Sequence, residues 1–250
     1  MVYLSGDPHG EFARFQLLYR QGEGKFTAED TLIFTGDFGY TCGLNSPRHK
    51  REFLDDLAAR PYTICFCDGN HEDFAALNSY PVIEWNGGLV HVIRPNILHL
   101  MRGQCYTIEG KTFLTLGGAY TRDAYIRQRD VDWFPEAELY TPEDYKTTAA
   151  TLKRMGNKVD FVLSHTCPAE IIRRMGHTPD PHDAQMTGHF DWVMYELGDS
   201  FKQWFFGHWH RDESITPRFR CIWFDLIALR EDENGECYTV IPPAGGSPYT

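Results

Sequence analysis

Five short polar motifs, each directly after an apolar run, constrain the fold of this sequence more than any other feature. Short continuous apolar runs are typical of strands buried on both faces of a sheet. In open α/β sheets, the residues just beyond the strand ends gather along one edge, where binding and catalytic groups lie. The motifs are Asp7-Pro8-His9, Gly36-Asp37, Gly69-Asn70-His71, Ser164-His165 and Gly207-His208-Trp209-His210. The sequence therefore predicts that their side chains meet at one edge of a buried sheet.

The residue types in these motifs are ligands for divalent metal ions. Carboxylate and imidazole groups bind such ions, and a carboxylate that bridges two ions holds them about 3.5–4 Å apart. Asp37 is the expected bridge, because it follows a central strand with no second carboxylate beside it. His208 and His210 lie two residues apart, so in an extended segment they point the same way and each can reach one ion. The expected ligands are Asp7, His9, Asp37, Asn70, His165, His208 and His210.

Each of these residues also has an ordinary structural interpretation. A single Asp or His at a strand end often caps a helix, forms a turn or makes a local hydrogen bond. The joint pattern argues for a shared role, since five motifs in the same strand-end context rarely arise by chance. We therefore expect two divalent ions at this edge.

The charge balance favours a small phosphorylated substrate over an extended nucleic acid. The net charge is −11, whereas proteins that follow a long polyanion usually carry a basic face. The compact basic run at 48–51 is followed by acidic residues on the same expected helix. At the metal site, two divalent ions set against Asp7, Asp37 and a bridging hydroxide leave a net positive centre, which attracts phosphate.

The order of expected elements predicts one domain with two sheets. Strands at 2–5, 31–35 and 62–67 alternate with helices at 11–21 and 47–59, which is typical of a parallel sheet. Both halves of the chain supply motifs, so two sheets should pack as a sandwich with helices outside. The domain is expected to span 1–241, followed by a loose tail at 242–250.

The rest of the chain predicts further elements. Between the third strand and the fourth motif we expect a short helix at 72–78, short β runs from 82 to 116, an irregular loop at 117–141, a helix at 142–156 capped by Thr141, and a strand at 159–164. After it we expect a loop-rich stretch containing His177, His182 and His189, and hairpin strands over the last forty residues.

A cytoplasmic protein without membrane association is expected. No apolar run approaches the roughly 20 residues of a membrane span. The sequence enters a strand at once, which leaves no room for a signal peptide. The cysteines fit this compartment, because seven, an odd number, cannot all form disulfide pairs within the chain. Cys65 and Cys67 fall in or beside an expected buried strand, where cysteine behaves as a small hydrophobic residue.

In order and spacing, the motifs resemble those of the calcineurin-like metallophosphoesterases. The resemblance runs from residue 7 to residue 210 and includes Gly69-Asn70-His71-Glu72 and Gly207-His208-x-His210. It implies an α/β fold, a four-layer α/β-β/α sandwich of two mixed sheets flanked by helices. It also implies two divalent metal ions, with Mn²⁺ as our first expectation and Fe, Zn or Ni as the others. One ion would be held by Asp7, His9, Asp37 and His210, and the other by Asp37, Asn70, His165 and His208.

The resemblance gives His71 a role other than metal binding. In the family this residue stands over the site, binds a phosphate oxygen and protonates the leaving group, for which an imidazole is well suited. Many members have an acidic residue three positions after the bridging Asp, but Tyr40 stands here. The acidic partner of His71 is therefore missing or supplied elsewhere, with Glu72 and Asp73 as candidates. This departure disfavours the phosphoprotein-phosphatase subgroup.

The loop at 117–141 is the expected place of substrate selection. Arg122 or Arg127 is a candidate for clamping a phosphate. The alternative is that the loop arginines pair with acidic neighbours on the surface. Tyr120 and Trp133 are open to either a core role or a stacking role.

Together these features predict a dinuclear-metal phosphoesterase that hydrolyses a small phosphodiester or phosphomonoester. A metal-bridging hydroxide would attack phosphorus in line, with His71 and Asp37 as the catalytic residues. One alternative is a nuclease acting on nucleic-acid ends. Another is a non-catalytic protein-interaction scaffold on the same fold, which relatives typically become after losing metal ligands, whereas all seven stand in this sequence.

Overall fold

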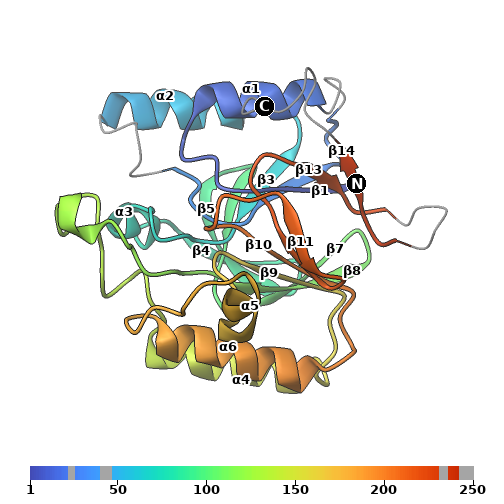
Figure 1. Cartoon of the computed structure of the whole chain (residues 1–250). Coiled ribbons are helices and arrows are strands. Elements are labelled where there is room, and N and C mark those ends of the chain that lie inside the picture. The colour runs from blue at the N-terminus through green and yellow to red at the C-terminus, as the bar shows by residue number, and fades with distance from the viewer. Residues whose placement is uncertain (22–25, 40–46, 231–235, 242–250) are drawn as a thin grey trace.

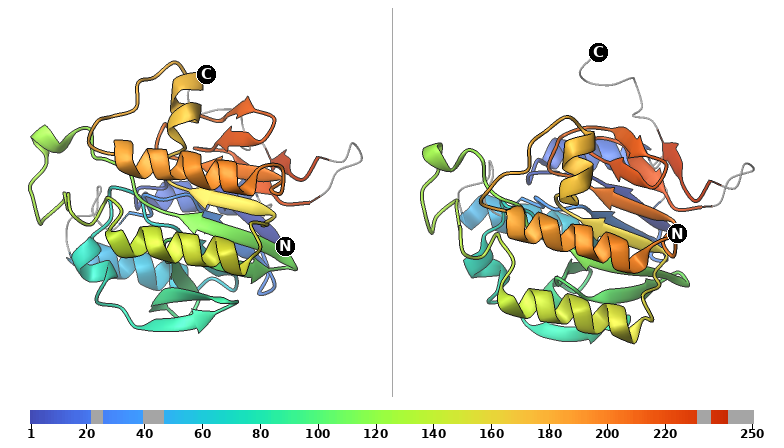
Figure 2. Two further views of the ribbon diagram at one scale, coloured as in Figure 1. Left: turned by 90° about the horizontal axis from the view of Figure 1, so that it is seen from below. Right: turned by 60° about the horizontal axis from the view of Figure 1, so that its bottom comes forward.

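The computed structural model describes residues 1–21, 26–39, 47–230 and 236–241. Two β-sheets pack face to face and helices cover the outer face of each, which gives four layers (Figure 1). Helices α1 (Phe12–Gln21) and α2 (Pro47–Ala58) lie on the first sheet. Helices α4 (Pro142–Arg154) and α6 (Ala184–Leu197) lie on the second, with α5 (Ala169–Arg174) packed against α6 (Figure 2). The expected α/β-β/α sandwich is confirmed.

The first sheet is parallel at its centre and antiparallel at its edges. Its strand order is β14-β13-β1-β2-β3-β6-β5-β4. The parallel pairs join β1, β2, β3 and β6, as the alternation of strands and helices predicts. The strands are β1 (Val2–Ser5), β2 (Thr31–Phe34), β3 (Thr63–Phe66), β4 (Val82–Trp85), β5 (Gly88–Arg94), β6 (Ile97–Leu100), β13 (Leu226–Ala228) and β14 (Thr239–Ile241).

The second sheet has the strand order β11-β12-β10-β9-β8-β7. Strands β8, β9, β10 and β12 pair in parallel, so this sheet also has a parallel centre. The β runs expected from 82 to 116 are divided between the sheets, because the chain crosses over between β6 and β7 at residues 101–104. The strands are β7 (Cys105–Ile108), β8 (Lys111–Leu116), β9 (Phe161–Ser164), β10 (Gln203–Phe206), β11 (Glu213–Thr216) and β12 (Phe219–Cys221).

Three hydrophobic cores hold the four layers together. One lies between the first sheet and its helices, and includes Phe15 of α1 and Leu57 of α2. A second lies between the second sheet and its helices and includes Phe190 of α6. The third fills the space between the sheets, where Cys65 and Phe205 are fully buried. Each such large apolar side chain contributes roughly 1.5–3 kcal/mol on burial, so the strand ends rest on a rigid base.

Helix α4 confirms its expected start, whereas the segment after β9 differs from expectation. The Thr141 hydroxyl accepts a hydrogen bond from the Asp144 amide, and the Asp144 carboxylate accepts one from Thr141 in return. The stretch expected to be loop-rich contains α5 and α6, so the assignment of His189 to a loop is wrong. Apolar residues at 186, 190, 193 and 197 follow the helical period and are buried, while Asp183 makes no side-chain cap that would mark the start of α6. The short helix expected at 72–78 narrows to α3 (Phe74–Leu77).

The last strands form hairpins, as expected, but the two hairpins belong to different sheets. Strand β11 pairs with β12 at the edge of the second sheet, and β13 pairs with β14 at the edge of the first. None of the helices in the described ranges is long and apolar enough to span a membrane. The expected tail at 242–250 lies outside the described residues.

Candidate metal centre

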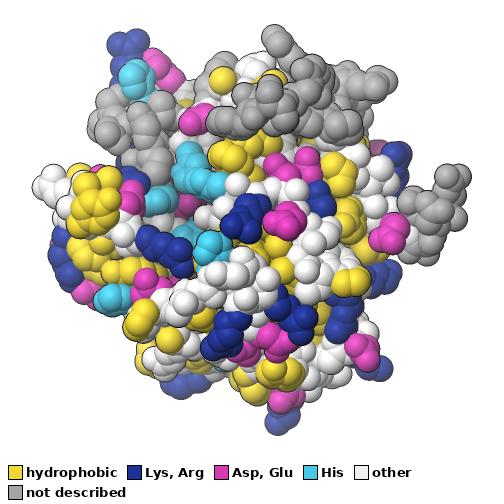
Figure 3. Space-filling view, in the orientation of Figure 1, with side chains coloured by type: hydrophobic (Ala, Val, Ile, Leu, Met, Phe, Trp, Pro, Cys, Tyr) yellow, Lys and Arg dark blue, Asp and Glu magenta, His cyan; other side chains and the backbone are white. Residues whose placement is uncertain are grey.

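The candidate ligands follow the carboxyl ends of five parallel strands. Asp7 and His9 follow β1, Asp37 follows β2, and Asn70 follows β3. From the second sheet, His165 follows β9, and His208 and His210 follow β10. Because the sheets face each other, the two sets of strand ends meet at one edge of the sandwich. Histidine side chains gather there in a hollow with Lys or Arg side chains at its rim (Figure 3).

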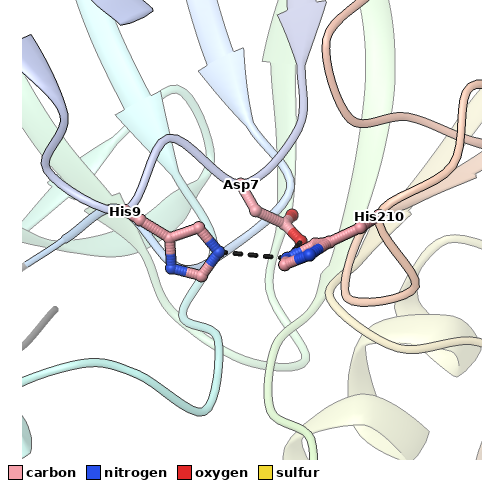
Figure 4. Close-up of side chains that lie close together, drawn as sticks. All are labelled: Asp7, His9 and His210. Carbon is pink, nitrogen blue, oxygen red and sulfur yellow. Dashed lines mark hydrogen bonds and ion pairs between the residues drawn. The ribbon is translucent and has the colours of Figure 1, made fainter. Parts of the chain in front are cut away.

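Asp7, His9 and His210 form what we call the outer cluster, shown in Figure 4. The Nε2 atoms of His9 and His210 lie 3.1 Å apart, and His210 Nε2 lies 3.4 Å from Asp7 Oδ2. The side chain of His210 is 44% exposed and that of His9 is 21% exposed, while Asp7 is buried. Two imidazole nitrogens and a carboxylate oxygen therefore face one point near the surface.

Asn70, His165 and His208 form the inner cluster. The Oδ1 atom of Asn70 lies 3.0 Å from His165 Nε2 and 3.1 Å from His208 Nδ1. His165 is fully buried, and its Nδ1 lies 2.8 Å from the Thr35 carbonyl oxygen. In the neutral ring, Nδ1–H donates to that carbonyl, so Nε2 is left as an acceptor. It then faces the acceptor Oδ1 of Asn70, an arrangement that either a proton on Nε2 or a bound metal cation satisfies.

Asp37 lies between the clusters. Its Oδ2 is 3.3 Å from His165 Nε2 of the inner cluster and 3.9 Å from His9 Nε2 of the outer cluster. The other oxygen, Oδ1, accepts a hydrogen bond from the backbone amide of His71 at 2.8 Å. Oδ2 is thus the atom directed toward both groups of imidazoles, which is the position that a bridging carboxylate requires.

The backbone at these positions is strained. His9, Asp37, His208 and His210 all have positive φ, between 47° and 65°, a region that residues other than glycine rarely adopt. Such conformations cost on the order of 1 kcal/mol each and persist where the surroundings enforce them. The neighbouring glycines show how tightly the turns pack, because a Cβ at Gly207 would lie 2.0 Å from Asp7 Oδ1.

The electrostatics of the site favour bound positive charge. Burial lowers the pKa of His165, yet the carboxylates of Asp37 and Asp7 outweigh burial and raise it to about 10. Burial raises the pKa of Asp37, but His165 and His71 hold it well below its usual range. Burial and His165 together lower the pKa of His208 well below its usual value, which keeps the ring neutral and leaves one of its nitrogens with a free lone pair. Oδ1 of Asp7 is buried and accepts no hydrogen bond from the described residues. These residues fit divalent cations.

His71 lies beside the outer cluster, with its ring centroid 5.8 Å from that of His9. Burial lowers the pKa of His71, and the positive charge of Arg127 lowers it further. The negative charges of Asp37 and Asp123 act in the opposite direction. Neither carboxylate expected to pair with His71 does so. Oε1 of Glu72 accepts hydrogen bonds from the amides of Phe38 and Gly69, and Asp73 caps α3 and pairs with Lys50 at 2.8 Å. Both carboxylates are held in place by the backbone turns around the site.

The two candidate phosphate-binding arginines differ in their surroundings. Arg127 pairs with Asp123 at 2.6 Å, the kind of contact that the alternative of a local ion pair expects. The Arg122 guanidinium lies 4.5 Å above the ring of Trp209, next to His208, and lines a cavity of about 530 Å³. Tyr120 stacks on His182 at 4.5 Å in the wall of this cavity.

Sequence reasoning gave no role to His177 or His182, which also line the cavity. His177 stacks on Trp209 at 4.8 Å, so the segment between α5 and α6 closes one side of the site. No local motif marks these residues, because their position depends on how that segment folds back. A separate cavity of about 330 Å³ lies beside α3, where Asp68 and Arg102 are paired with each other at 2.5 Å.

Comparison with known proteins shows one clear match at the level of families. The profile described as calcineurin-like phosphoesterase matches residues 1–212, a range that contains all seven candidate ligands. A search of curated proteins found no match. Among solved structures, phosphopantetheinyl hydrolase PptH from Mycobacterium tuberculosis is similar, with a TM-score of 0.44 and 16% identity over 98% of this chain and 96% of that chain. Sulfate thiohydrolase SoxB from Thermus thermophilus has a TM-score of 0.45 and 12% identity over 92% of this chain and 42% of that chain.

Proposed function

Because the chain belongs to the calcineurin-like phosphoesterase family, we propose that it is a metal-dependent hydrolase of a small phosphodiester or phosphomonoester. The observation that carries the proposal is the convergence of acceptor atoms on two neighbouring points, with Oδ2 of Asp37 directed toward both. A scaffold protein would have no use for four strained backbone positions or for buried carboxylate oxygens without donors.

The two clusters divide the ligands between two ions. The outer ion would be held by Asp7, His9, Asp37 and His210, and the inner ion by Asp37, Asn70, His165 and His208. When bound, two divalent ions, with Mn²⁺ as our first choice, supply charge that stabilises phosphate oxygens and lower the pKa of bound water to about 7. The backbone amides of His71 and His208 hold the carboxylates of Asp37 and Asp7 in place, at 2.8 and 2.7 Å, so little reorganisation is needed on binding.

His71 is the residue we assign to proton transfer. The side chain of His71 does not contribute an atom to either cluster. It is nevertheless close enough to Asp37 and His9 for their charges to affect its pKa. A bound phosphate anion adds negative charge beside the ring and therefore raises its pKa toward neutrality. His71 would then donate to a phosphate oxygen and pass a proton to the departing alkoxide.

The cavity beside Arg122 is our candidate for the organic part of the substrate. Its volume of about 530 Å³ falls in the range of small-molecule sites. Arg122 lies near enough to lower the pKa of His208, so it is within electrostatic reach of a phosphate at the inner cluster. Arg122→Ala should raise KM by roughly tenfold, the loss of one charged contact. Arg129→Ala is the matched control, because this arginine of the same loop is 54% exposed and pairs with Glu136, and its KM should change less. Equal effects would contradict the assignment.

The experiment that tests the function compares two chromogenic substrates. Mn²⁺-dependent hydrolysis of bis-p-nitrophenyl phosphate is measured beside that of p-nitrophenyl phosphate, with Asp37→Asn as the control. Diester turnover that is lost in the control supports a phosphodiesterase and directs the search to cyclic nucleotides and nucleic-acid ends. Monoester turnover alone supports a phosphatase. No turnover of either, in protein that binds Mn²⁺, would contradict the proposal for simple phosphoesters.

A further inference from the structure

Glu138 is a fully buried carboxylate in the loop between β8 and α4. It accepts hydrogen bonds from the Thr121 amide at 3.0 Å, from the Thr121 hydroxyl at 2.5 Å and from Trp133 Nε1 at 3.3 Å. Within the described part of the chain, no Lys or Arg forms an ion pair with it. A buried carboxylate held by three donors and no cation is costly to maintain, so its surroundings require an explanation.

Thr121 connects this carboxylate to the inner cluster. Asn70 Nδ2 lies 3.2 Å from the Thr121 hydroxyl oxygen, and Asn70 Oδ1 faces His165 and His208. Burial raises the pKa of Glu138, whereas its hydrogen bonds from Thr121 and Trp133 lower it. Three donors directed at one carboxyl group are those of the ionised form, which can only accept, and a hydroxyl has one hydrogen. The Thr121 hydrogen therefore goes to Glu138, and the Thr121 oxygen is left to accept from the amide NH₂ of Asn70. The direction of both hydrogen bonds thus follows from the ionised form of Glu138, to which the three donors point.

The orientation of the Asn70 amide follows from this chain of hydrogen bonds. The oxygen and nitrogen of an amide are nearly equal in size, so packing alone does not determine which of them faces a cation. With Thr121 accepting from Nδ2, the carbonyl oxygen is directed to the inner cluster. A flipped amide would present NH₂ to the cation and lose a ligand.

The loop that carries Thr121 and Glu138 is anchored close to the site. Arg102 donates to the carbonyl oxygens of Ala137, Glu138 and Leu139 at 2.7 to 3.2 Å and pairs with the buried Asp68. At the start of the loop, a Cβ on Gly117 would lie 2.2 Å from Asp68 Oδ1. The two ends of the loop are thus held against the residues just before Asn70, and Thr121 meets Glu138 in a fixed position.

We propose that Glu138 is a positioning residue which, through Thr121, holds the Asn70 carbonyl oxygen toward the inner metal ion. The inference rests on the proposed function, because it assumes that the inner cluster binds a cation. Partners of this kind fix ligand orientation, and their loss typically weakens metal binding about 10–100-fold. In its ionised form Glu138 also places a buried negative charge near the site, which favours the bound cation.

Mn²⁺ binding to the full chain, measured by equilibrium dialysis, tests the proposal without relying on turnover. Thr121→Val keeps the shape of the side chain but removes the hydroxyl, and it should weaken one of the two Mn²⁺ sites about 10–100-fold while leaving the other unchanged. Thr121→Ser keeps the hydroxyl and should restore binding. Glu138→Gln should weaken the same site as Thr121→Val.

Thr115→Val is the matched control. Thr115 is also fully buried, and its hydroxyl donates to the Met101 carbonyl at 2.9 Å. Among the described residues it makes no hydrogen bond to either cluster, so Thr115→Val loses a buried hydrogen bond while both Mn²⁺ sites keep their affinity. Thermal unfolding of each variant shows that it is folded. If Thr121→Val binds two Mn²⁺ ions as tightly as the unaltered protein, the positioning role is refuted. If the unaltered protein itself binds no Mn²⁺, the proposed function fails instead.

Discussion

The outer and inner clusters use similar ligands but are held in different ways. In the outer cluster, His210 is 44% exposed and its ring stacks flat on Trp223 at 4.9 Å, while its ligand nitrogen faces His9. In the inner cluster, His165 is fully buried and bonded to the Thr35 carbonyl, and Asn70 is bonded to Thr121. The two outer imidazoles are thus placed by ring packing near solvent, and the inner side chains by buried hydrogen bonds.

This difference suggests that the outer cluster exchanges its metal ion more readily, whereas the inner cluster holds its ligand geometry more rigidly. A site whose ligands reach solvent can be filled and emptied without opening the core, whereas a site braced by buried hydrogen bonds keeps its geometry at the expense of access. We therefore expect the inner ion to be retained longer and to tolerate less change in its ligands. The substitutions below test this expectation, beginning with the largest effect.

His165→Gln should have the largest effect, on both activity and folding. It removes an inner ligand and leaves the carboxylates of Asp37 and Asp7 without the buried positive charge between them. We expect hydrolysis to fall by about 10³-fold and the metal-free protein to lose roughly 3–5 kcal/mol of unfolding free energy, the cost of breaking a buried charge pair. Initial rates and urea unfolding measure the two effects. A metal-free protein of unchanged stability would show that the inner cluster is not braced as described.

His71→Asn should reduce turnover strongly while leaving both clusters intact. General acid catalysis contributes about 10²–10⁴-fold, and the side chain of His71 is not among the ligand atoms that converge on either cluster. We expect turnover to fall within that range and metal content to stay near two ions per chain. Elemental analysis of the dialysed variant decides the point, since loss of an ion would make His71 a ligand and redefine the outer cluster.

His210→Gln should remove the outer ion alone. Since this side chain is 44% exposed, we expect the unfolding free energy of the metal-free protein to change by less than about 1 kcal/mol. Metal content should fall from two ions to one after dialysis. The decisive comparison is between the unfolding free energies of metal-free His210→Gln and His165→Gln. An equal loss in the two variants would contradict the distinction between the clusters.

The stability of the fold should also depend on pH through a residue outside both clusters, His189 on α6. This contribution has to be separated from that of the clusters before the two are compared at low pH. Burial lowers the pKa of His189 on α6 to about 4, whereas an unfolded histidine titrates near ~6.5. Between these values the unfolded chain binds a proton that the folded chain does not, so the unfolding free energy falls as pH falls from about 7 to 4. Burial likewise lowers the pKa of His91 to about 4, so two histidines contribute over this pH range. His189→Phe should therefore reduce the slope in metal-free protein, and an unchanged slope would assign the acid sensitivity to other groups.

The strand ends and the meeting of the candidate ligands at one edge could be predicted from the sequence because both depend on local patterns. Apolar runs such as 32–34 and 161–163 form β2 and β9 with little change in bounds, and the motifs after them come together because parallel strands end at the same edge. The crossover between the sheets at 101–104 was not predicted, since pairing partners depend on contacts distant in sequence.

The residues that brace the ligands could not be predicted in the same way. Thr121 and Glu138 lie 17 positions apart in an irregular loop, and only the folded loop brings them together beside Asn70. The expectation that Glu72 or Asp73 pairs with His71 was not met, for a related reason. Glu72 and Asp73 are adjacent to it in sequence, but the turn directs them to the backbone and to Lys50. Adjacency in sequence is a poor guide to side-chain direction at a tight turn.

The division of the ligands between the sheets has a consequence for how this molecule would come apart. An ion held by His9 and His210 joins residues 201 positions apart, one from each sheet. Such an ion acts as a reversible cross-link, because the two sheets cannot separate at this edge while both imidazoles remain bound. Unfolding in the presence of metal then has to wait for the ion to leave. The lifetime of the folded protein would be set by the metal's dissociation rate, and supply of the metal would determine how long each copy survives.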